Sequence, residues 1–552
     1  MTTPFVCFRT CGTPDLLNVL YPSPESVWFE MRNIGFYNLA ALVLYYVRIV
    51  VLATGAIVGV AVPGGLTADI ASGAPASALK RDDAVKKELN LWASEERFEA
   101  LLRALQGLEA HGLVPDGYGY TALYQMRGQP VLREKAATKA WMQAAMDLRY
   151  GRTKQPHRDS SLPEGKAHAD LDRTLQAAIA AERVEQSLEP LAPQHPEYLG
   201  LKAALDRLRD APDDNIIPLP EGATLKRGST GLRVQMLRAR LVQLGYLVPG
   251  QSSNDFDDAV VQAIEMFQRD MGLEPDAIVG PATRATLNLS KASKIDILRI
   301  NLERWRWLPH NLGRRHVRVN IAGFEASAYN DGVRALSHRA IVGRFQRQTP
   351  VFSDEIEYIV FNPWWETPAK LARQDELPLF RRDPEAVRRL GFQVLDRKSG
   401  IPVDAATIDW HKVRMDPFPC RLRQAPGPQN ALGQVKILFP NRHSVYLHDT
   451  PSRQLFEHSK RTFSSGCIRV QDVLELVAWL LNGTGNWTLP QIQAVVKTGE
   501  EKWVTLEHPV PVYILYMTAE VGPDGRVRYL SDVYDRDATV LRKLKLIRSD
   551  VI

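Results

Sequence analysis

The sequence predicts a multidomain α+β protein with a helical domain, a small three-helix domain, and a mainly β domain that carries an inserted subdomain. Residues 80–220 are rich in Ala, Leu, Glu and Arg at helical spacing, and residues 221–290 hold a compact set of shorter amphipathic helices. From residue 291 the apolar period shortens to two, as in VYLHD and PVYILYM. A chain of 552 residues has room for three or four such units.

Composition narrows the class of protein. Charged residues make up 24% and hydrophobic residues 45% of the chain, which is typical of globular domains and excludes a disordered or collagen-like chain. The net charge of +6 is small for this length, and no zinc-finger spacing, RNP run or basic heptad occurs, so we expect no nucleic-acid partner. The four cysteines (Cys7, Cys11, Cys420 and Cys467) form neither a disulfide framework nor a CxxC metal site, so any functional cysteine acts singly.

Residues 1–79 are predicted to export the chain. Residues 39–62 are apolar except for Arg48, and small residues follow, including Ala76-Ser77-Ala78. The apolar run fits a membrane-spanning anchor, or a secretory signal whose positive region ends at Arg48, preceded by an N-terminal extension. A buried core helix is the third interpretation. The first two place the rest of the chain outside the cytoplasm.

Two predicted domains, residues 80–220 and 221–290, come before the candidate catalytic residues. Residues 80–220 have helical periodicity and no titratable cluster, so we expect a scaffold. In residues 221–290, one helix face is predicted from Leu232, Val234, Leu237, Leu241 and Leu244, with Gly245 ending the helix. Together with the later AIEMFQ, GL and GPAT, this region resembles the three-helix peptidoglycan-binding domain, and it departs from that family at Ala277, where the turn usually has Gly.

Residues 291–552 are predicted to form the last and largest domain. Strand-like runs alternate with a few helical stretches around 378–391 and 470–481. Residues 363–424 carry few strand signals and many charges, so we interpret them as a capping insertion or lid. Asp524-Gly525 predicts a late hairpin.

The residues that suggest chemistry lie in this last domain. Ser464, Ser465, Gly466 and Cys467 precede an apolar helical pattern, so Cys467 is predicted at a helix N-terminus beside Arg469. Such a setting lowers a thiol pKa from about 8.5 to roughly 3.5–7.5. The amides of Gly466 and Cys467 are expected to bind a developing oxyanion.

A histidine is predicted to complete the site. His448 ends a predicted strand nineteen positions before Cys467 and can serve as its base. The two residues alone also fit a buried structural cysteine.

The runs HDTP and FSSGCIRV resemble the signature of the L,D-transpeptidase (YkuD) family. NLERWRWLP, QTPVFSDEI, NPWWETP and PGPQNALGQVKILFPN are similar to its long, periplasmic YcbB-like branch, which joins a scaffold, a peptidoglycan-binding domain and a catalytic domain with a capping subdomain.

The resemblance implies roles for individual residues. Cys467 is the nucleophile, His448 is the general base and later acid, and the backbone carbonyl of Asp449 orients the imidazole. Gly466 provides an oxyanion-hole amide. Substrate-binding positions are expected at Arg469, Ser465, Ser464, Tyr446, Phe463 and Trp365. For Arg469 a structural ion pair is the competing interpretation.

The implied activity is an acyl transfer that needs no metal or organic cofactor. Cys467 attacks a tetrapeptide stem, releases D-Ala and forms a thioester, and a second stem then attacks the thioester to give a 3→3 cross-link. The alternatives are L,D-carboxypeptidation or D-amino-acid exchange at the same site, and a non-catalytic wall-binding scaffold. The implied partners are stem peptides, glycan strands and cell-wall synthesis proteins, with membrane contact only through residues 1–79. The family also implies carbapenem sensitivity.

Overall fold

The structure is a computed structural model, and it describes residues 91–153, 164–213, 216, 218–250, 253–522 and 524–545. The predicted export or anchor segment, residues 1–79, lies outside the described residues. In the described ranges, no helix combines the length and apolar character needed to cross a membrane.

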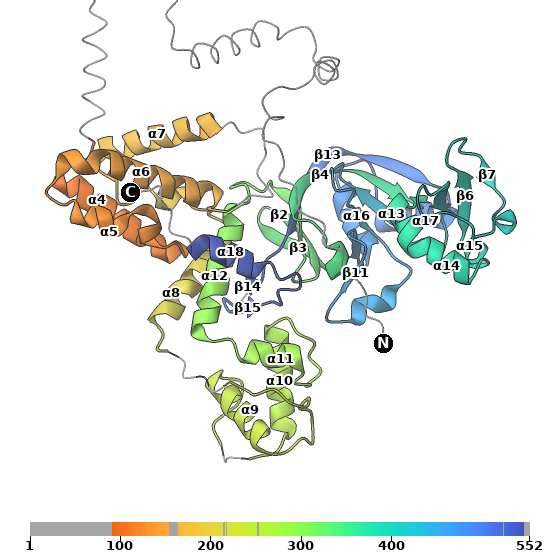
Figure 1. Ribbon diagram of the computed structural model, residues 1–552, viewed down its shortest axis with the longest axis horizontal. Helices are drawn as coiled ribbons and strands as arrows, with labels where there is room; N and C mark the ends of the chain where they lie inside the picture. The colour runs from red at the N-terminus through yellow and green to blue at the C-terminus, as the bar shows by residue number, and fades with distance from the viewer. Residues whose placement is uncertain are drawn as a thin grey trace, which may run out of the picture. The chain divides into compact units, whose positions relative to one another are not determined.

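The first described region is helical, as predicted (Figure 1). Its helix α4 begins after Ser94, whose hydroxyl accepts a hydrogen bond from the Arg97 amide at 3.3 Å, a capping contact that satisfies a free donor of the first turn. Phe98, Leu101 and Leu105 follow at helical spacing and are buried. The α-helices of this region are α4 (Glu95–Gly107), α5 (Tyr120–Gln125), α6 (Pro130–Tyr150), α7 (Glu164–Ala180) and α8 (Pro196–Asp210). Its 3₁₀ turns are η2 (Leu108–His111), η3 (Pro115–Tyr118) and η4 (Glu189–Leu191).

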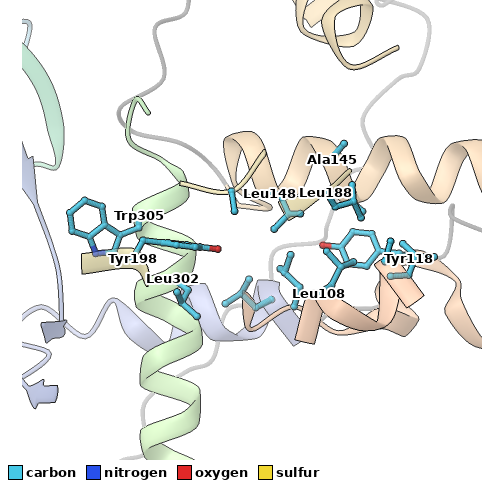
Figure 2. Close-up of a cluster of buried hydrophobic side chains, with 14 of the residues drawn as sticks. Leu108, Tyr118, Ala145, Leu148, Leu188, Tyr198, Leu302 and Trp305 are labelled. Carbon is cyan, nitrogen blue, oxygen red and sulfur yellow. The ribbon is translucent and has the colours of Figure 1, made fainter. Parts of the chain in front are cut away.

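The core of this helical region includes later parts of the chain. Helix α12 (Lys291–Arg306) packs against α8 and α18 (Asp537–Lys545). Figure 2 shows Leu302 and Trp305 of α12 in one buried cluster with Tyr198 and Leu108 of the helical region. The predicted limit between residues 290 and 291 follows the end of the small domain's core, but it does not mark the start of the core of the last domain. The segment after it begins with α12, whose buried side chains belong to the core of the helical region.

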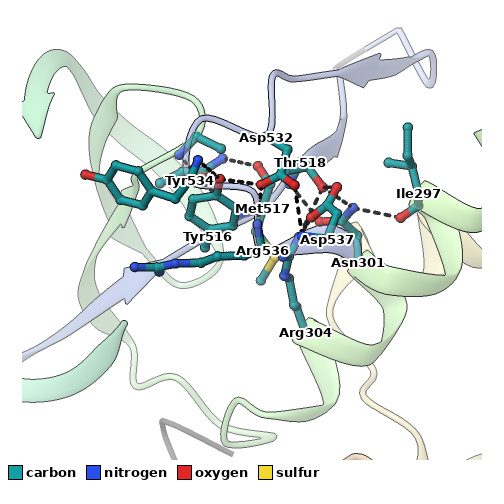
Figure 3. Close-up of polar contacts among 12 residues, drawn as sticks. Ile297, Asn301, Arg304, Tyr516, Met517, Thr518, Asp532, Tyr534, Arg536 and Asp537 are labelled. Atoms are coloured by element: carbon teal, nitrogen blue, oxygen red, sulfur yellow. Dashed lines mark hydrogen bonds and ion pairs between the residues drawn. The ribbon is translucent and has the colours of Figure 1, made fainter. Parts of the chain in front are cut away.

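Polar contacts also join α12 to the segment that follows the large sheet (Figure 3). The Thr518 amide donates to Asn301 Oδ1 at 2.8 Å, and Arg304 pairs with Asp537 at 2.7 Å. Asp537 also accepts a hydrogen bond from the Thr518 hydroxyl at 2.9 Å. Because these groups are largely buried, they satisfy one another and hold α12 to the segment that follows the large sheet.

The small domain has three helices, as predicted: α9 (Leu232–Gln243), α10 (Asp258–Asp270) and α11 (Pro281–Leu287). Gly245 follows α9 with φ +78°, the left-handed backbone expected at a helix end. The prediction for Leu232 is wrong: its side chain is 70% exposed, because it occupies the first turn of α9 rather than the buried face. Ala277 keeps the left-handed turn, with φ +56°, although it lacks the freedom of glycine.

The last domain is built on a nine-stranded sheet with the order β11-β3-β12-β10-β9-β4-β13-β1-β2. The long strand β3 pairs with β2 as well as β12, so the sheet closes on itself. The strands are β1 (Arg315–Asn320), β2 (Glu325–Asn330), β3 (Val333–Gly343), β4 (Phe352–Phe361), β9 (Val435–Leu438), β10 (Leu447–His448), β11 (Thr462–Ser464), β12 (Ile468–Val470) and β13 (Lys502–Leu515). Apolar residues of these strands and of helices α16 (Val473–Leu481) and α17 (Leu489–Thr498) form its core. The late hairpin is confirmed as β14 (Ala519–Val521) and β15 (Val527–Tyr529).

The insertion between β4 and β9, here called the cap (residues 363–433), has its own sheet and core. Its four short strands pair in the order β5-β8-β6-β7, which the few strand signals of residues 363–424 did not predict. The strands have two to five residues, too few for alternation to be recognised. The cap contains β5 (Trp365–Glu366), α13 (Ala369–Leu371), the π-helical segment η6 (Ala372–Glu376), α14 (Leu377–Arg382), α15 (Ala386–Arg389), β6 (Phe392–Asp396), β7 (Pro402–Val403), η7 (Ala405–Thr407) and β8 (Cys420–Gln424). The remaining short turns are η5 (Phe345–Arg347) and η8 (Arg453–Glu457).

Candidate active site

Strand register brings the predicted site residues to one face of the sheet. Strands β10 and β12 are parallel neighbours, with Leu447 opposite Ile468 and His448 opposite Arg469. Leu447 and Ile468 point into the hydrophobic core. Because side chains alternate along a strand, His448 and Arg469 occupy the opposite face, and so do Tyr446 and Cys467, one position before the core pair.

That face forms one wall of a cavity of about 730 Å³. We call the cavity-lining residues Tyr446, His448, Cys467 and Arg469 the sheet wall. We count Lys436 of β9 with them because it pairs with His448 on the neighbouring strand, although it does not itself line the cavity. The cap supplies the facing residues, here the cap wall: Trp365, Lys370, Leu371, Asp375, Glu376, Leu379, Leu390, Phe392 and Gln424. The β3–β4 loop closes the cavity with Arg344, Arg347 and Gln348. The sequence prediction therefore located one wall of the cavity and missed most of the other.

Cys467 does not lie at a helix N-terminus, so that prediction is wrong. Residues Ile468–Val470 form strand β12, and α16 begins only at Val473, after Asp472. The alternating β-branched residues Ile468 and Val470 pair with β10 and β3, which overrides the helical pattern that starts after them. Cys467 therefore does not lie in the first turn of α16, where the helix dipole would favour a thiolate.

The surroundings of the thiol also shift its pKa in the direction opposite to that predicted. Partial burial raises the pKa of Cys467, although the Tyr446 phenol, Lys436 and Arg469 act to lower it. The thiol donates a weak hydrogen bond to the Ser444 carbonyl, with 3.8 Å between Sγ and O. At neutral pH Cys467 is therefore a thiol, which would have to lose its proton to act as a nucleophile.

His448 is a buried, neutral imidazole. Its Nδ1 lies 2.5 Å from the backbone oxygen of Asp449, the contact that the resemblance implied. A carbonyl only accepts hydrogen bonds, so Nδ1 carries the proton and Nε2 is left as the proton acceptor. Burial, together with the positive charges of Arg469 and Lys436, lowers the pKa of His448 to about 3. The Asp449 carboxylate is engaged elsewhere and accepts the Gln434 amide at 2.9 Å.

Hydrogen bonds within the loop before Cys467 fix its conformation. The Ser464 hydroxyl accepts the Gly466 amide at 3.1 Å and donates to the Cys467 carbonyl at 2.5 Å. The Gly466 amide is thus occupied, contrary to the predicted oxyanion role, whereas the Cys467 amide has no acceptor among the described residues. Gly466 adopts φ +125°, which residues with a Cβ rarely adopt. Ser464, predicted to bind substrate, uses its hydroxyl to hold the loop.

Ser465 joins this loop to two arginines. Its hydroxyl accepts from Arg347 at 2.9 Å and from Arg344 at 3.2 Å. Arg347 also donates to Asp375 of the cap from both terminal guanidinium nitrogens, and to Gln374 Oε1 at 2.9 Å. One side chain therefore connects the loop of the nucleophile to the cap.

The other predicted substrate-binding residues differ from one another. Arg469 lines the cavity, makes no ion pair with any described residue, and has a buried Nε without a hydrogen-bond partner. Tyr446 and Trp365 also line the cavity. Phe463 does not: it points to the opposite side of β11 from Ser464 and packs against His458, with ring centroids 5.3 Å apart.

Several residues of the site escaped the sequence analysis: Arg344, Arg347, Asp375 and Glu376, which line the cavity, and Lys436, which pairs with His448 on the neighbouring strand. Lys436 carried a usable signal, because it alternates with the core residues Val435 and Ile437 on a strand of the site. The others lie on loops and short helices without a periodic signal. Within the described ranges, no group of three or more His, Cys, Asp or Glu side chains is arranged to hold a metal ion.

Comparison with known proteins supports three domains. Residues 87–205 match the family described as "Scaffold domain", residues 230–287 match "Putative peptidoglycan binding domain", and residues 314–510 match "L,D-transpeptidase catalytic domain" (YkuD). The chain is 35% identical over 254 residues to a "Putative L,D-transpeptidase" of Haemophilus influenzae, a match that covers 46% of this chain and 50% of that protein. It is 34% identical over 74 residues to an N-acetylmuramoyl-L-alanine amidase of Bacillus licheniformis, which is 13% of this chain and 21% of the amidase.

The match spans about half the length of the Haemophilus protein. Among solved structures, an L,D-transpeptidase of Xylanimonas cellulosilytica is 18% identical with a TM-score of 0.18, covering 53% of this chain and 98% of that one. One from Stackebrandtia nassauensis is 12% identical with a TM-score of 0.21, covering 54% and 96%. These low scores add nothing to the assignment, which rests on the family matches and on the Haemophilus relative. The chain carries a catalytic domain of the YkuD L,D-transpeptidase family, preceded by a scaffold domain and a peptidoglycan-binding domain.

Proposed function

We propose that this chain is a cysteine-dependent peptidoglycan L,D-transpeptidase of the YcbB-like branch that forms 3→3 cross-links. The observation that carries the proposal is the common face of Cys467 and His448 in one cavity, with the imidazole held by the Asp449 carbonyl. Nucleophile, base and orienting group are thereby present, as acyl transfer through a covalent intermediate requires.

In the first half-reaction, Cys467 Sγ attacks the carbonyl of the third-position diamino acid of a tetrapeptide stem. His448 Nε2 takes the thiol proton and returns it to the amine of D-Ala as the C–N bond breaks. The Cys467 amide, which has no acceptor in the described structure, stabilises the oxyanion. Arg469 lacks an anionic partner among the described side chains and binds a carboxylate of the stem.

In the second half-reaction, the amine of another stem attacks the thioester and forms the cross-link. Attack by water gives a tripeptide, and attack by a free D-amino acid gives exchange. The peptidoglycan-binding domain retains the glycan, and the substrate places the enzyme outside the cytoplasm, in the periplasm. Export or anchoring by residues 1–79 and contact with cell-wall synthesis proteins belong to the same proposal.

The experiment that tests this function uses the full chain with purified disaccharide-tetrapeptide, analysed by mass spectrometry beside Cys467→Ala. A dimer lacking one D-Ala, absent from the variant, supports cross-linking through Cys467. If tripeptide monomer is the sole product, water rather than a second stem attacks the thioester, and the chain is a carboxypeptidase. If wild type and variant both leave the substrate unchanged, the enzymatic proposal fails and the wall-binding scaffold is favoured.

A further inference from the structure

The cap wall presents two adjacent acidic residues, Asp375 and Glu376, at the end of the π-helical segment η6. Turns of π-helix are rare, and they occur frequently at functional sites. Both residues line the cavity that holds Cys467. Their surroundings differ, and this difference points to a role for one of them.

Asp375 already has a cationic partner within the protein. Both of its carboxylate oxygens accept hydrogen bonds from Arg347, whose side chain is only 14% exposed. Arg347 in turn reaches Ser465 beside the nucleophile. Asp375 therefore has a structural role in seating the cap.

Glu376 has no such partner. Its side chain is half-buried and forms no hydrogen bond or ion pair with any residue in the described part of the chain. Burial and the neighbouring charge of Asp375 raise the pKa of Glu376 to about 7. A carboxylate that a protein partly desolvates without supplying a cation is unfavourable unless a ligand provides the positive charge.

Most cations at or beside the cavity lie on other surfaces. Arg469 and Lys436 belong to the sheet wall, and Arg344 belongs to the β3–β4 loop. The cap wall itself contributes one cation, Lys370, which is not paired with Glu376 in the described structure. These groups suit the carboxylates of a stem peptide. The cap wall opposite them has Glu376 as a carboxylate free to receive a primary ammonium group.

We propose that Glu376 is the acceptor-binding residue of the cap, whose carboxylate binds the ammonium group of the attacking stem peptide and takes one of its protons. This inference rests on the proposed function and names the group that recognises the acceptor.

The protons balance through the second half-reaction. An ammonium cannot attack a thioester, so R–NH₃⁺ first gives one proton to Glu376 and becomes R–NH₂. The nitrogen then bonds to the thioester carbon, and His448 Nε2 takes a proton from it. Collapse of the tetrahedral intermediate breaks the C–S bond and returns Cys467 as thiolate, which recovers its proton from His448. Glu376 releases its proton to solvent.

The test compares the full-length wild type, Glu376→Gln and the control Glu385→Gln. Glu385 is a cap glutamate whose side chain is 74% exposed, and it lies outside the cavity lining. Three rates are measured by mass spectrometry: formation of a carbapenem adduct, of tripeptide and of cross-linked dimer.

We expect Glu376→Gln to form the dimer about 10- to 100-fold more slowly than wild type, because the variant loses a hydrogen bond to a charged group. Its adduct formation stays within about twofold of wild type, because Gln keeps the shape of the cap while donor attack does not use residue 376. Glu385→Gln matches wild type in all three rates.

A neutral nucleophile provides a second measurement. Hydroxylamine is largely unprotonated at neutral pH and needs no carboxylate to activate it, so it should release the thioester equally fast in wild type and in Glu376→Gln. Dimer formation at the wild-type rate in Glu376→Gln overturns the inference, and so does an equal loss of adduct and dimer, which indicates a structural role. If the wild type forms neither adduct nor product, the proposed function itself fails, and that outcome is visible before any variant is compared.

Discussion

The two walls of the cavity are built in different ways. On the sheet wall, the register of β10 against β12 determines where His448 and Cys467 lie, and their flanking residues are fixed in a hydrophobic core. On the cap wall, Asp375 and Glu376 lie on a π-helical segment of a subdomain that has its own small core. The difference indicates that the positions of Cys467 and His448 depend on the sheet, whereas the proposed recognition of the second stem peptide depends on the cap. Changes on each wall should therefore affect different half-reactions.

The largest effect is expected at the nucleophile of the sheet wall. Cys467→Ala should abolish both the carbapenem adduct and all products, because no thioester can form. Cys420→Ala is the matched control, since Cys420 is the other described cysteine, lies in the cap and does not line the cavity. Intact-mass analysis after incubation with a carbapenem distinguishes them. An adduct on Cys467→Ala would show that another residue reacts.

Loss of the base should be severe but incomplete. His448→Gln removes the Nε2 proton acceptor, and loss of general-base catalysis typically slows a reaction by about 10²–10⁴-fold. Stopped-flow acylation by a carbapenem measures this rate. In the wild type the rate should change little between pH 7.5 and 5.5, because the imidazole with a pKa of about 3 stays neutral there. A steep loss near pH 6.5 would contradict this environment for His448.

The same imidazole predicts how folding stability depends on pH. The pKa of His448 is about 3 in the folded chain and about 6.5 when unfolded, so the unfolded chain binds the extra proton between these values. Above pH 6.5, His448 is neutral in both states and does not lower the free energy of unfolding. As the pH falls from 6.5 toward 3, the unfolded chain gains a proton that the folded chain does not bind, so the free energy of unfolding decreases. Thermal unfolding at several pH values should show a smaller acid loss in His448→Gln than in wild type. An equal loss would assign the acid sensitivity to other groups.

Arg347 connects the loop before Cys467 to the cap wall, so its removal should affect both half-reactions. Arg347→Ala loses the bonds to Ser465 and Asp375, and we expect adduct and dimer formation each to fall about tenfold. Hydrogen exchange should rise in residues 372–376. Arg388→Ala, an exposed cap arginine, is the control. A loss confined to dimer formation would show that Arg347 serves the cap alone.

The smallest effect is expected from an accessory residue of the sheet wall. Tyr446→Phe removes a phenol that lowers the thiol pKa, and a single hydrogen bond of about 1 kcal/mol corresponds to a roughly fivefold slower acylation. Phe463→Leu should leave acylation unchanged, because Phe463 packs against His458 outside the cavity. An effect at Phe463 equal to that at Tyr446 would contradict the assignment of the walls.

The sequence predicted the parts of this molecule that depend on periodicity and motif. Alternation along VYLHD placed His448 on a strand, and helical spacing located α9 and α10. It failed where tertiary pairing decides, because Ile468–Val470 joins the sheet and moves the helix start away from Cys467. The pKa of the thiol was predicted in the wrong direction because burial outweighs the nearby charges.

The cap wall could not be predicted for a physical reason. Arg347 and Asp375 are separated in sequence and meet only because the cap folds over the β3–β4 loop. No local pattern encodes such a contact. Glu376 lies in a segment without amphipathic periodicity, and only the folded chain shows that it lines the cavity as a partly buried carboxylate.

The point at which the cap enters the sheet has a further consequence. Phe361 is paired with Val435, and the Asn362 amide donates to the Gln434 carbonyl at 2.8 Å, so the chain leaves and re-enters the sheet at a single rung. The cap therefore takes the position that a short loop would have in a hairpin of β4 and β9. Doubling the length of such a loop costs only about 0.6 kcal/mol in closure entropy. Segments of very different size can therefore be exchanged between residues 362 and 434, which makes this rung a natural graft point for giving the same nucleophile a different acceptor.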